Sequence, residues 1–373
     1  MKIDIILPNK ELFSSKKASA VSITVNNSIK FSKYKKNISV FGQKTENPYF
    51  KKNFFGFKTN KIFNLGKNLL IAKNYLKISK LFDCKNRIIE IHNRPYIFHY
   101  IYSRLPNAPI ILYFHNDPQT MKGSITVSDR KKIIQNASGV IFVSEFLKKK
   151  FLNGIDKDNK NLYVLPNSLD KNYNVRKNKE KNILFVGRLV EEKGPKLFVE
   201  VVKDIAENYP KWKFIIVGTA KAAQKNLTTN FEKKIIKDFL NIGKNVKYYG
   251  FLSNQKVKNL MSNSSILVVP SIWQEPFGMT ALEGLANKMA VIGSNVGGLK
   301  SILYKRGVLI NKIDKIKLKN VINKLINNPN ELRRLQNSTW NGYCYGQRDI
   351  SLKQDNYREK IIKYWEKNLK IKN

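Results

Sequence analysis

Residues 182–202 read NILFVGRLVEEKGPKLFVEVV, and this stretch decides the fold. Its apolar, mostly branched run ends at Val186, which is typical of a strand buried on both faces of a parallel sheet. Gly187 allows a tight turn, and Pro195 stands where a helix begins, in the turn that favours proline. The helix expected at residues 195–208 carries its apolar side chains on one face. The stretch therefore predicts strand, loop and helix, the unit from which α/β folds are built.

The same alternation runs along the whole chain of 373 residues, a length that suggests two domains. Residues 168–181 are polar and charged without apolar periodicity, so we interpret them as a linker. The fold class is thus α/β, with two Rossmann-like doubly wound domains facing across a cleft, where the carboxyl ends of the strands meet a ligand. The expected strands are Ile3–Leu7, Ile38–Phe41, Ile88–Ile91, Ile110–Phe114, Val140–Val143, Leu162–Leu165, Ile183–Val186, Phe214–Val217, Val246–Tyr249, Ile266–Val269, Ala290–Ile292 and Val308–Ile310.

The composition narrows the class of protein. Lys and Arg number 69 against 27 Asp and Glu, a net charge of +42. We attribute it first to codon bias, second to a membrane surface and third to nucleic acid, because lysines are scattered everywhere and no RNA-binding motif accompanies them. Cys84 and Cys344 lack the spacing of a disulfide framework or a zinc site. We expect a cytoplasmic protein, since neither a secretory signal nor a membrane-spanning apolar run occurs.

Two cations flank the loop of the opening stretch. Arg188 follows the predicted strand directly, and Lys193 comes just before the predicted helix. The start of a helix already attracts anions through its N–H groups and its dipole. The arrangement indicates a diphosphate site, although an ordinary basic loop would explain this motif if it stood alone.

A second motif, VPSIWQEPFGMTALEG at residues 269–284, places Glu275 in a loop and Glu283 in the helix that follows. Carboxylates accept hydrogen bonds from sugar hydroxyls, and N–H groups at a helix start hold phosphate or sugar oxygens. A third motif, VIGSNVGGL, contains the turn Gly297-Gly298, which would let the backbone approach a ligand closely. The N–H groups at the helix start belong to Phe277, Gly278, Met279 and Thr280.

Together the three motifs resemble the C-terminal domain of glycosyltransferase family 4, a large family of retaining enzymes with the GT-B fold. The pattern here is Gly-Arg-Leu-x-x-x-Lys-Gly, then two glutamates separated by seven residues, then Gly-Gly, within residues 182–300. The resemblance implies an N-terminal acceptor-side domain at residues 1–170 and a nucleotide-sugar-binding domain at 181–350. It also implies that the C-terminal helix, within residues 353–373, packs back on the first domain.

The resemblance implies a role for each matching position. Arg188 and Lys193 would bind the donor diphosphate and neutralise the charge that develops as it leaves, so no metal or other cofactor is expected. Glu283 would bind the ribose hydroxyls, and Glu275 the hydroxyls of the transferred sugar. Further donor contacts would come from Gly187, Phe277, Gly278, Met279 and Thr280, and, near the nucleobase, from Tyr249, Gly250 and Phe251.

The first half offers a less explicit site. His115 follows a predicted strand in ILYFHNDP, and the resemblance implies that it contacts the donor sugar near the reacting carbon. A histidine satisfied within its own loop explains the position nearly as well. This stretch and EIHNRP resemble a bacterial subgroup that acts on lipopolysaccharide or other envelope saccharides. The acceptor side would be lined by Glu90, His92, Asn93 and Arg94, and Asn116 is a further substrate-binding candidate.

The chain departs from the family in places. Where many members have a Gly-Gly loop after the first strand, this chain has Ser14–Ser22 without glycine. Ser301 stands where the family often has a glutamate. The Asp156-Lys-Asp158 triplet looks like a metal-binding DxD motif, but it follows Gly154 rather than a strand, so we interpret it as a polar loop.

The sequence therefore predicts a retaining hexosyltransferase that moves a sugar from a nucleoside-diphosphate sugar to a saccharide or glycolipid acceptor. We expect it in lipopolysaccharide or cell-envelope polysaccharide synthesis, in the cytoplasm or peripherally on an anionic membrane surface, the cytoplasmic face of the inner membrane. One alternative is a GT-B sugar-nucleotide epimerase, which product analysis with a labelled donor would separate from a transferase. A different class is a basic nucleic-acid-binding protein, which a salt-sensitive gel shift with RNA would support, although no nucleic acid is expected.

Overall fold

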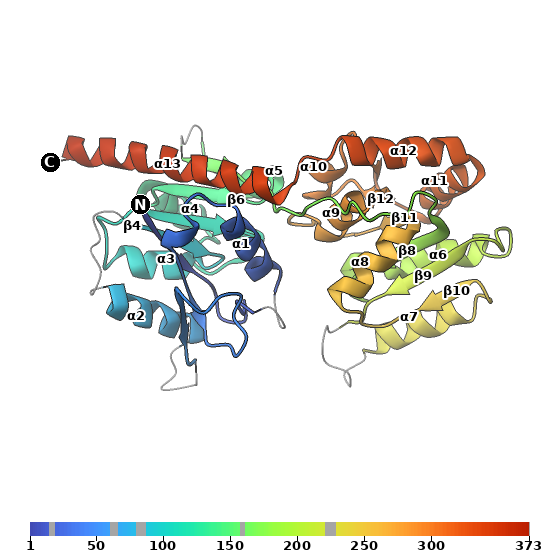
Figure 1. Ribbon diagram of the computed structural model, residues 1–373, viewed down its shortest axis with the longest axis horizontal. Coiled ribbons are helices and arrows are strands. Elements are labelled where there is room, and N and C mark those ends of the chain that lie inside the picture. The colour runs from blue at the N-terminus through green and yellow to red at the C-terminus, as the bar shows by residue number, and fades with distance from the viewer. Residues whose placement is uncertain (15–18, 60–65, 80–86, 157–160, 221–228, 373) are drawn as a thin grey trace. The chain divides into compact units, whose positions relative to one another are not determined.

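The structure is a computed structural model in which the chain forms two compact units (Figure 1). One unit contains Met1–Ser168 and Tyr345–Asn373, and the other contains Leu169–Cys344. Each holds a parallel sheet with helices packed against it, so the predicted α/β class with two Rossmann-like domains is confirmed. The structure describes residues 1–14, 19–59, 66–79, 87–156, 161–220 and 229–372.

The N-terminal unit is built on a sheet in the order β3-β2-β1-β4-β5-β6-β7, seven strands over its described residues. Its strands are β1 (Lys2–Ile6), β2 (Ile38–Gln43), β3 (Phe54–Phe57), β4 (Arg87–His92), β5 (Ile110–Phe114), β6 (Gly139–Phe142) and β7 (Leu162–Val164). Its helices are α1 (Ala20–Lys30), η1 (Lys35–Asn37), α2 (Lys67–Ser79), α3 (Pro95–Tyr102), η2 (Pro118–Thr120), α4 (Val127–Asn136), α5 (Glu145–Leu152) and α13 (Gln347–Lys372).

Strand β3 is the element that the sequence did not predict. It has four residues, sits at the edge of the sheet beside β2 and is half-buried along its length. Its rings pack inward, because Phe55 stacks on Phe41 and Phe54 stacks on Phe13. A short edge strand with a central glycine lacks the continuous apolar run by which the other strands were recognised.

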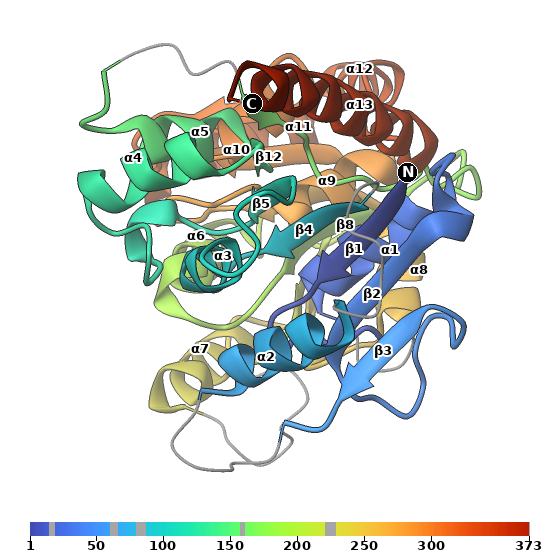
Figure 2. The ribbon, with the colours of Figure 1, turned by 90° about the vertical axis from the view of Figure 1, so that its left-hand side faces the viewer.

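Helix α13 returns the end of the chain to the N-terminal unit and begins earlier than residue 353, at Gln347. In Figure 2 it runs close to α1, and the two helices are in contact. Arg358 binds both carboxylate oxygens of Glu90 on β4, at 2.7 Å each. It also binds Asp355, which accepts a hydrogen bond from Ser32. These charges are fully buried and mutually satisfied, the condition under which a buried ion pair is tolerated.

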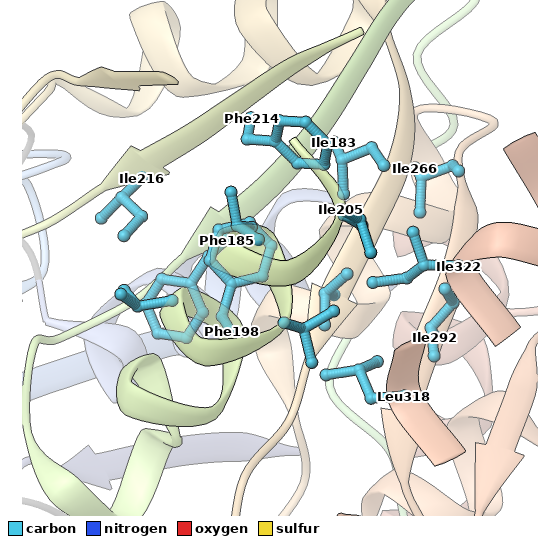
Figure 3. Packing of buried hydrophobic residues seen from close by; sticks show 14 of the residues in the cluster. Ile183, Phe185, Phe198, Ile205, Phe214, Ile216, Ile266, Ile292, Leu318 and Ile322 are labelled. Carbon is cyan, nitrogen blue, oxygen red and sulfur yellow. The ribbon is translucent and has the colours of Figure 1, made fainter. Parts of the chain in front are cut away.

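The C-terminal unit has a sheet in the order β10-β9-β8-β11-β12-β13, six strands over its described residues. Strands β8 and β9, the helix between them and the far helix α11 enclose a core of Ile, Leu, Val and Phe side chains (Figure 3). The strands are β8 (Glu180–Val186), β9 (Lys213–Val217), β10 (Val246–Tyr248), β11 (Ser264–Val269), β12 (Ala290–Ser294) and β13 (Val308–Ile310). The helices are η3 (Glu191–Lys193), α6 (Pro195–Ile205), α7 (Asn230–Leu240), α8 (Asn254–Asn263), α9 (Met279–Ala286), α10 (Leu299–Leu303), α11 (Lys315–Asn327) and α12 (Pro329–Asn341).

Both sheets share one strand order, in which the first strand lies between the second and the fourth. The chain therefore changes direction across the sheet between β1 and β4 in one unit and between β8 and β11 in the other. Loops that follow these strands diverge and leave room for a ligand at the carboxyl edge. The loop after β4 carries Asn93, and the loops after β8 and β11 carry Lys193 and Glu275.

The polar segment before β8 is held on the C-terminal unit. The N–H of Asn172 donates to the carbonyl of Ala286, at the end of α9. The ammonium of Lys179 donates to the carbonyls of Ser262 and Asn287, near the ends of α8 and α9. Within the described residues, no helix combines the length and apolar character needed to cross a bilayer.

Candidate functional site

The loops after β8 and β11 touch at the carboxyl edge of the C-terminal sheet. Gly194 has a φ of 69°, a left-handed conformation that L side chains rarely adopt, and Pro195 then opens α6. A Cβ at Gly194 would collide with the carbonyl oxygen of Pro270, which follows β11. Gly194 therefore allows this contact between the two loops, in addition to the start of the helix.

An ion pair joins the first motif to the second. The Lys193 ammonium lies 2.5 Å from the Oε1 of Glu275, and the hydroxyl of Ser271 donates to the same oxygen at 2.6 Å. The ring of Trp273 lies 5.4 Å from the Lys193 nitrogen, within the range of a cation–π contact. Lys193 is thus held between a buried carboxylate and an aromatic face, and an anion that approaches it competes with Glu275.

Arg188 is brought to the same loop but stays apart from this pair. Its side chain is exposed, and it makes no hydrogen bond or ion pair with the described residues. A guanidinium presents up to five N–H donors in a planar fork, which suits the oxygens of a phosphate. Arg188 could therefore bind an anionic ligand without first breaking an ion pair.

Glu283 is the fifth of the eight residues of α9, and the residue before the helix, Gly278, has a φ of 106°. Part of Glu283 stays accessible, but burial of its carboxyl raises the pKa to about 7. No side-chain hydrogen bond of Glu283 occurs within the described part of the chain. Its carboxyl therefore remains available to a hydroxyl group, as a donor or an acceptor according to pH. Phe277 is buried before the helix, and Gly278, Met279 and Thr280 are partly exposed at its start.

Gly297 and Gly298 allow the backbone of their turn to approach another segment closely. The close approach that they allow is to the backbone of the Glu275 loop, where Gly298 donates to the carbonyl of Glu275 at 2.6 Å. The N–H of Gly297 donates to the side chain of Gln274. A Cβ at either glycine would collide with the backbone of residues 274–277. The glycine pair therefore holds the Glu275 loop in place.

The residues expected near a nucleobase follow β10, at the same edge of the sheet. Tyr249 and Phe251 are 37% and 57% exposed, which is unusual for large rings and leaves them open to stacking. The carbonyl of Gly250 accepts a hydrogen bond from Gly218, the residue after β9. Gly187, the residue after β8, donates in turn to Val217. The loops after these three neighbouring strands are thus bonded to one another.

The N-terminal unit gathers a neutral polar cluster at its own carboxyl edge. The Nδ1 of His92, the last residue of β4, lies 2.8 Å from the Nε2 of His115, which follows β5. The backbone N–H of His115 donates to the side-chain oxygen of Asn93. Asn93 has a φ of 53°, and its buried amide nitrogen has no hydrogen-bond partner in the described residues. Strain of this kind concentrates at functional sites, and Asn116 lies exposed beside the cluster.

Both histidine rings are held neutral by their surroundings. Burial, and then the positive charge of Arg358, lowers the pKa of His92 to about 3. Burial, and then the neighbouring His92, lowers the pKa of His115 well below its usual range. The His92 ring stacks on Tyr113 with centroids 4.4 Å apart. The cluster therefore offers hydrogen bonds without charge.

Two of the residues expected on the acceptor side contribute to the fold. The expectation for Glu90 was wrong, because its carboxylate is buried and held by Arg358 and by the hydroxyl of Tyr113. The guanidinium of Arg94 donates to the carbonyl of Asn93, so it helps to fix the turn after β4. The glutamate was misplaced because one charged residue within a buried strand gives no sign of its partner, which here lies 268 residues away.

Several other expectations lie partly or wholly outside the described residues. Residues 15–18 of the Ser14–Ser22 segment, Asp158 of the acidic triplet and Cys84 belong to the undescribed ranges. Ser301 donates to the carbonyl of Gly298, a local bond within the turn. In the part of the chain that the structure describes, no three His, Cys, Asp or Glu side chains form a group that could hold a metal ion.

The sequence did not single out Ser271 and Trp273, which contact the ion pair between Lys193 and Glu275. Both lie inside the second motif, Ser271 four residues and Trp273 two residues before Glu275, so their position near a charged residue was the available signal. A serine and a tryptophan in a loop carry no chemistry by themselves. Only the packing of the two loops reveals what they touch.

The chain resembles known proteins in sequence and in fold. Residues 167–340 match the family described as Glycosyl transferases group 1. The chain is 33% identical over 233 residues to an uncharacterized glycosyltransferase of Methanocaldococcus jannaschii, covering 61% of each chain. It is 23% identical over 232 residues to a lipopolysaccharide 1,2-N-acetylglucosaminetransferase of Salmonella typhimurium, covering 59% of this chain and 57% of that protein. The matched segment thus spans about three fifths of each of these two relatives.

A solved structure resembles the chain over nearly its full length. Anabaena HepE in complex with UDP has a TM-score of 0.75 at 17% sequence identity, with 96% of this chain and all of that chain covered. At this identity the likeness concerns the fold alone, and it identifies the fold as GT-B.

Proposed function

We propose that this chain is a glycosyltransferase that takes a sugar from a nucleoside-diphosphate donor, with its match to the group 1 glycosyl transferases as the premise. The observation that carries the proposal is the contact between Lys193 and Glu275 at the carboxyl edge of the sheet, with Arg188 and Glu283 in the adjoining loop and helix. A cation beside a carboxylate suits a ligand that combines a diphosphate with a hydroxyl-rich sugar.

The geometry suggests how the residues divide the work. Lys193 would leave Glu275 for the donor diphosphate, and together with the exposed Arg188 it would stabilise the charge that grows as the diphosphate departs. Glu275, freed from Lys193 but still bonded to Ser271, would accept hydrogen bonds from the transferred sugar. Glu283 would bind the ribose hydroxyls. Two cations supply the electrostatic stabilisation, so we propose a reaction that needs no metal ion.

The finer assignment rests on the motifs and on the relatives. We assign the chain to glycosyltransferase family 4, with retention at the anomeric carbon, on the order and spacing of its three motifs. A uridine nucleotide is the first donor to test, because HepE was solved with UDP. A role in lipopolysaccharide or other envelope-saccharide synthesis is supported by the name of the Salmonella relative.

The acceptor is proposed to be a saccharide or glycolipid bound by the N-terminal unit. A polar pocket of about 340 Å³ opens at the carboxyl ends of β2 and β3. It lies on the same edge of the sheet as the His92–His115 cluster, two or three strands away. At roughly 5 Å per strand, this spacing fits an acceptor of several sugar units. The pocket is lined by Gln43, Lys44, Thr45, Glu46, Phe57, Lys58 and Thr59.

A second pocket supports the proposed attachment to an anionic membrane on the cytoplasmic face. It has a volume of about 480 Å³, and its apolar lining of Ile29, Ile38 and Phe50 is bordered by three lysines, Lys35, Lys36 and Lys52. Apolar surface beside cations suits an anionic phospholipid, with about 1 kcal/mol from each lysine near the surface.

Sedimentation with phosphatidylserine vesicles tests this attachment. The triple variant K35E/K36E/K52E should lose binding, while the triple variant K233E/K234E/K237E, with the same change of charge on α7, should retain most of it. Equal loss in both variants would assign the binding to total charge and remove the pocket from the proposal.

The proposed activity is tested in two steps. A thermal-shift screen of UDP-, GDP- and ADP-sugars should raise the melting temperature with one donor class, because a ligand that binds only the folded state stabilises it. That donor, labelled at the anomeric carbon and given with saccharide acceptors, should yield a glycoside with retained configuration by NMR, with or without EDTA. Epimerised donor as the product would replace the proposal with the epimerase, and activity that requires a divalent ion would contradict the metal-free site.

A further inference from the structure

We infer that His92 is a positioning residue that fixes His115 in the tautomer with its proton on Nδ1, so that His115 acts as a hydrogen-bond donor and not as a base. The tautomer follows from the contacts of the two rings. Its consequence for sugar transfer rests on the proposed function.

The contact between the two rings admits only two arrangements. A neutral imidazole has one N–H donor and one bare nitrogen that accepts. Across the 2.8 Å contact, either His92 donates from Nδ1 to the Nε2 of His115, or His115 donates from Nε2 to the Nδ1 of His92. The ring that donates then has a bare nitrogen at its other position. The ring that accepts carries its proton on its other nitrogen.

The surroundings of His92 favour the first arrangement. Its Nε2 is buried and has no hydrogen-bond partner among the described residues. If His115 donated, the His92 proton would have to sit on this nitrogen as an orphaned N–H, and buried orphaned N–H groups are rare in native proteins. If His92 donates, its Nε2 is left as a bare acceptor, which costs less. His115 then accepts at Nε2 and carries its own proton on Nδ1.

The charged neighbours oppose any addition of a proton to the pair. On β4, Glu90 faces the pair with its carboxylate held by Arg358 of α13, and Asp355 of α13 shares the same guanidinium. On β5, Tyr113 stacks on His92 and donates its hydroxyl to Glu90. The negative charges are thus satisfied within the network, and Arg358 adds a positive charge that lowers the pKa of His92. The rings stay neutral, so the tautomers persist across physiological pH.

The fixed tautomer decides what His115 can do for a ligand. The backbone of His115 is held by Asn93, and the ring keeps 8% of its surface accessible. The nitrogen not engaged by His92 is Nδ1, which carries the proton and can donate to a hydroxyl, carbonyl or carboxylate oxygen. A general base would instead present a bare nitrogen to the substrate. His115 would therefore bind an oxygen of the sugar substrate and leave the acceptor proton to another group.

The chain is well suited to a direct measurement of this tautomer. It contains three histidines, so selective 15N-histidine labelling of the full-length protein gives three ring spin systems in long-range 1H–15N correlation spectra. Between pH 5.5 and 8, His92 and His115 should both show the neutral ring with the proton on Nδ1, with no titration. A His115 ring that is protonated on Nε2, or that titrates in this range, overturns the inference. This result depends on no activity.

Two variants separate positioning from structure. His92→Phe keeps a ring against Tyr113 but cannot donate, so the His115 proton should move to a mixture of both nitrogens. His92→Asn can donate from about the position of Nδ1 and should restore the Nδ1 tautomer. At saturating donor, we expect kcat to fall about tenfold in His92→Phe and to recover in His92→Asn. The pH profile of kcat in the wild type should show no titration of a histidine.

The spectra and the sugar transfer of these variants test the positioning role of His92 and the proposed function separately. An unchanged His115 spectrum in a folded His92→Phe would show that His92 does not set the tautomer. The expected spectra together with a protein that transfers no sugar would contradict the proposed function and leave the positioning role intact.

Discussion

The carboxyl edges of the two sheets differ in how they handle charge, although the strands follow the same order. In the C-terminal unit the charges lie at the edge itself, where Lys193 pairs with Glu275 and Arg188 is exposed without a partner among the described residues. In the N-terminal unit the charges of Glu90 and Arg358 are buried and bound to one another. Beside them, the ends of β4 and β5 carry a cluster of neutral histidine rings and an asparagine amide.

This difference shows how one fold can suit two kinds of ligand. Cations that are exposed or bound to a single exchangeable carboxylate attract phosphates. Neutral donors and acceptors in a buried cluster suit hydroxyl groups, which they can bind without the cost of desolvating a charge. The variants below remove charge from each edge in turn.

The largest effect is expected where the buried network of the N-terminal unit is broken. Arg358→Met should lower the free energy of unfolding by about 3–5 kcal/mol, because it leaves Glu90 buried without a counter-charge. Urea denaturation measures the change, and Lys360→Met, at an exposed position on the same helix, is the control. The double variant Glu90→Gln/Arg358→Met should regain part of the loss. Equal stabilities for Arg358→Met and Lys360→Met would mean that the network does not hold α13.

At the other edge, a loss of charge should affect activity more than stability. Lys193→Ala should cost about 3 kcal/mol of transition-state stabilisation, roughly a hundredfold in kcat, by analogy with the loss of one oxyanion donor. The same holds for Arg188→Ala. Lys196→Ala, an exposed lysine of α6 paired with Glu200, is the matched control and should transfer sugar at the rate of the wild type. Turnover of Lys193→Ala at the control rate would remove Lys193 from the diphosphate site.

The smallest effect concerns the pH dependence of stability through Glu283. Its pKa in the folded protein is raised to about 7 from an ordinary 4.5, so its contribution to stability is fully present below pH 4.5 and is lost as pH rises through 7. Glu283→Gln removes this loss, so its stability relative to the wild type should increase by about 1–2 kcal/mol from pH 4.5 to pH 8, reduced by partial solvent exposure. Denaturation at the two pH values measures it, and a difference that does not change with pH would contradict the raised pKa.

The sequence predicted the fold well because the strands are buried on both faces. Runs such as Ile110–Phe114 are apolar at every position, a pattern that a parallel sheet requires. The edge strand β3 was not predicted because it is only half-buried and carries Gly56 near its centre. Contacts far apart in sequence, such as Arg358 with Glu90, leave no local pattern and cannot be predicted from one chain.

The residues of the site around Lys193 and Glu275 were predictable from the sequence, but the contacts between them were not. Lys193 and Glu275 were each recognised from a motif, yet the sequence gives no distance between two loops. The contact of Gly297-Gly298 was not predicted for the same reason, because only packing shows that the turn supports residues 274–277. His92 is likewise the last residue of β4 and His115 follows β5, so their contact depends on the register of β4 against β5.

The central claim is that the ion pair of the C-terminal unit opens to bind a nucleoside diphosphate. Titration calorimetry of the wild type with UDP, GDP and ADP, in buffer with EDTA, tests it most directly. We predict saturable binding of one nucleotide at one site per chain, weakened at least tenfold in Lys193→Ala and unchanged in Lys196→Ala. Binding of none of the three, or equal binding to both variants, would contradict the claim.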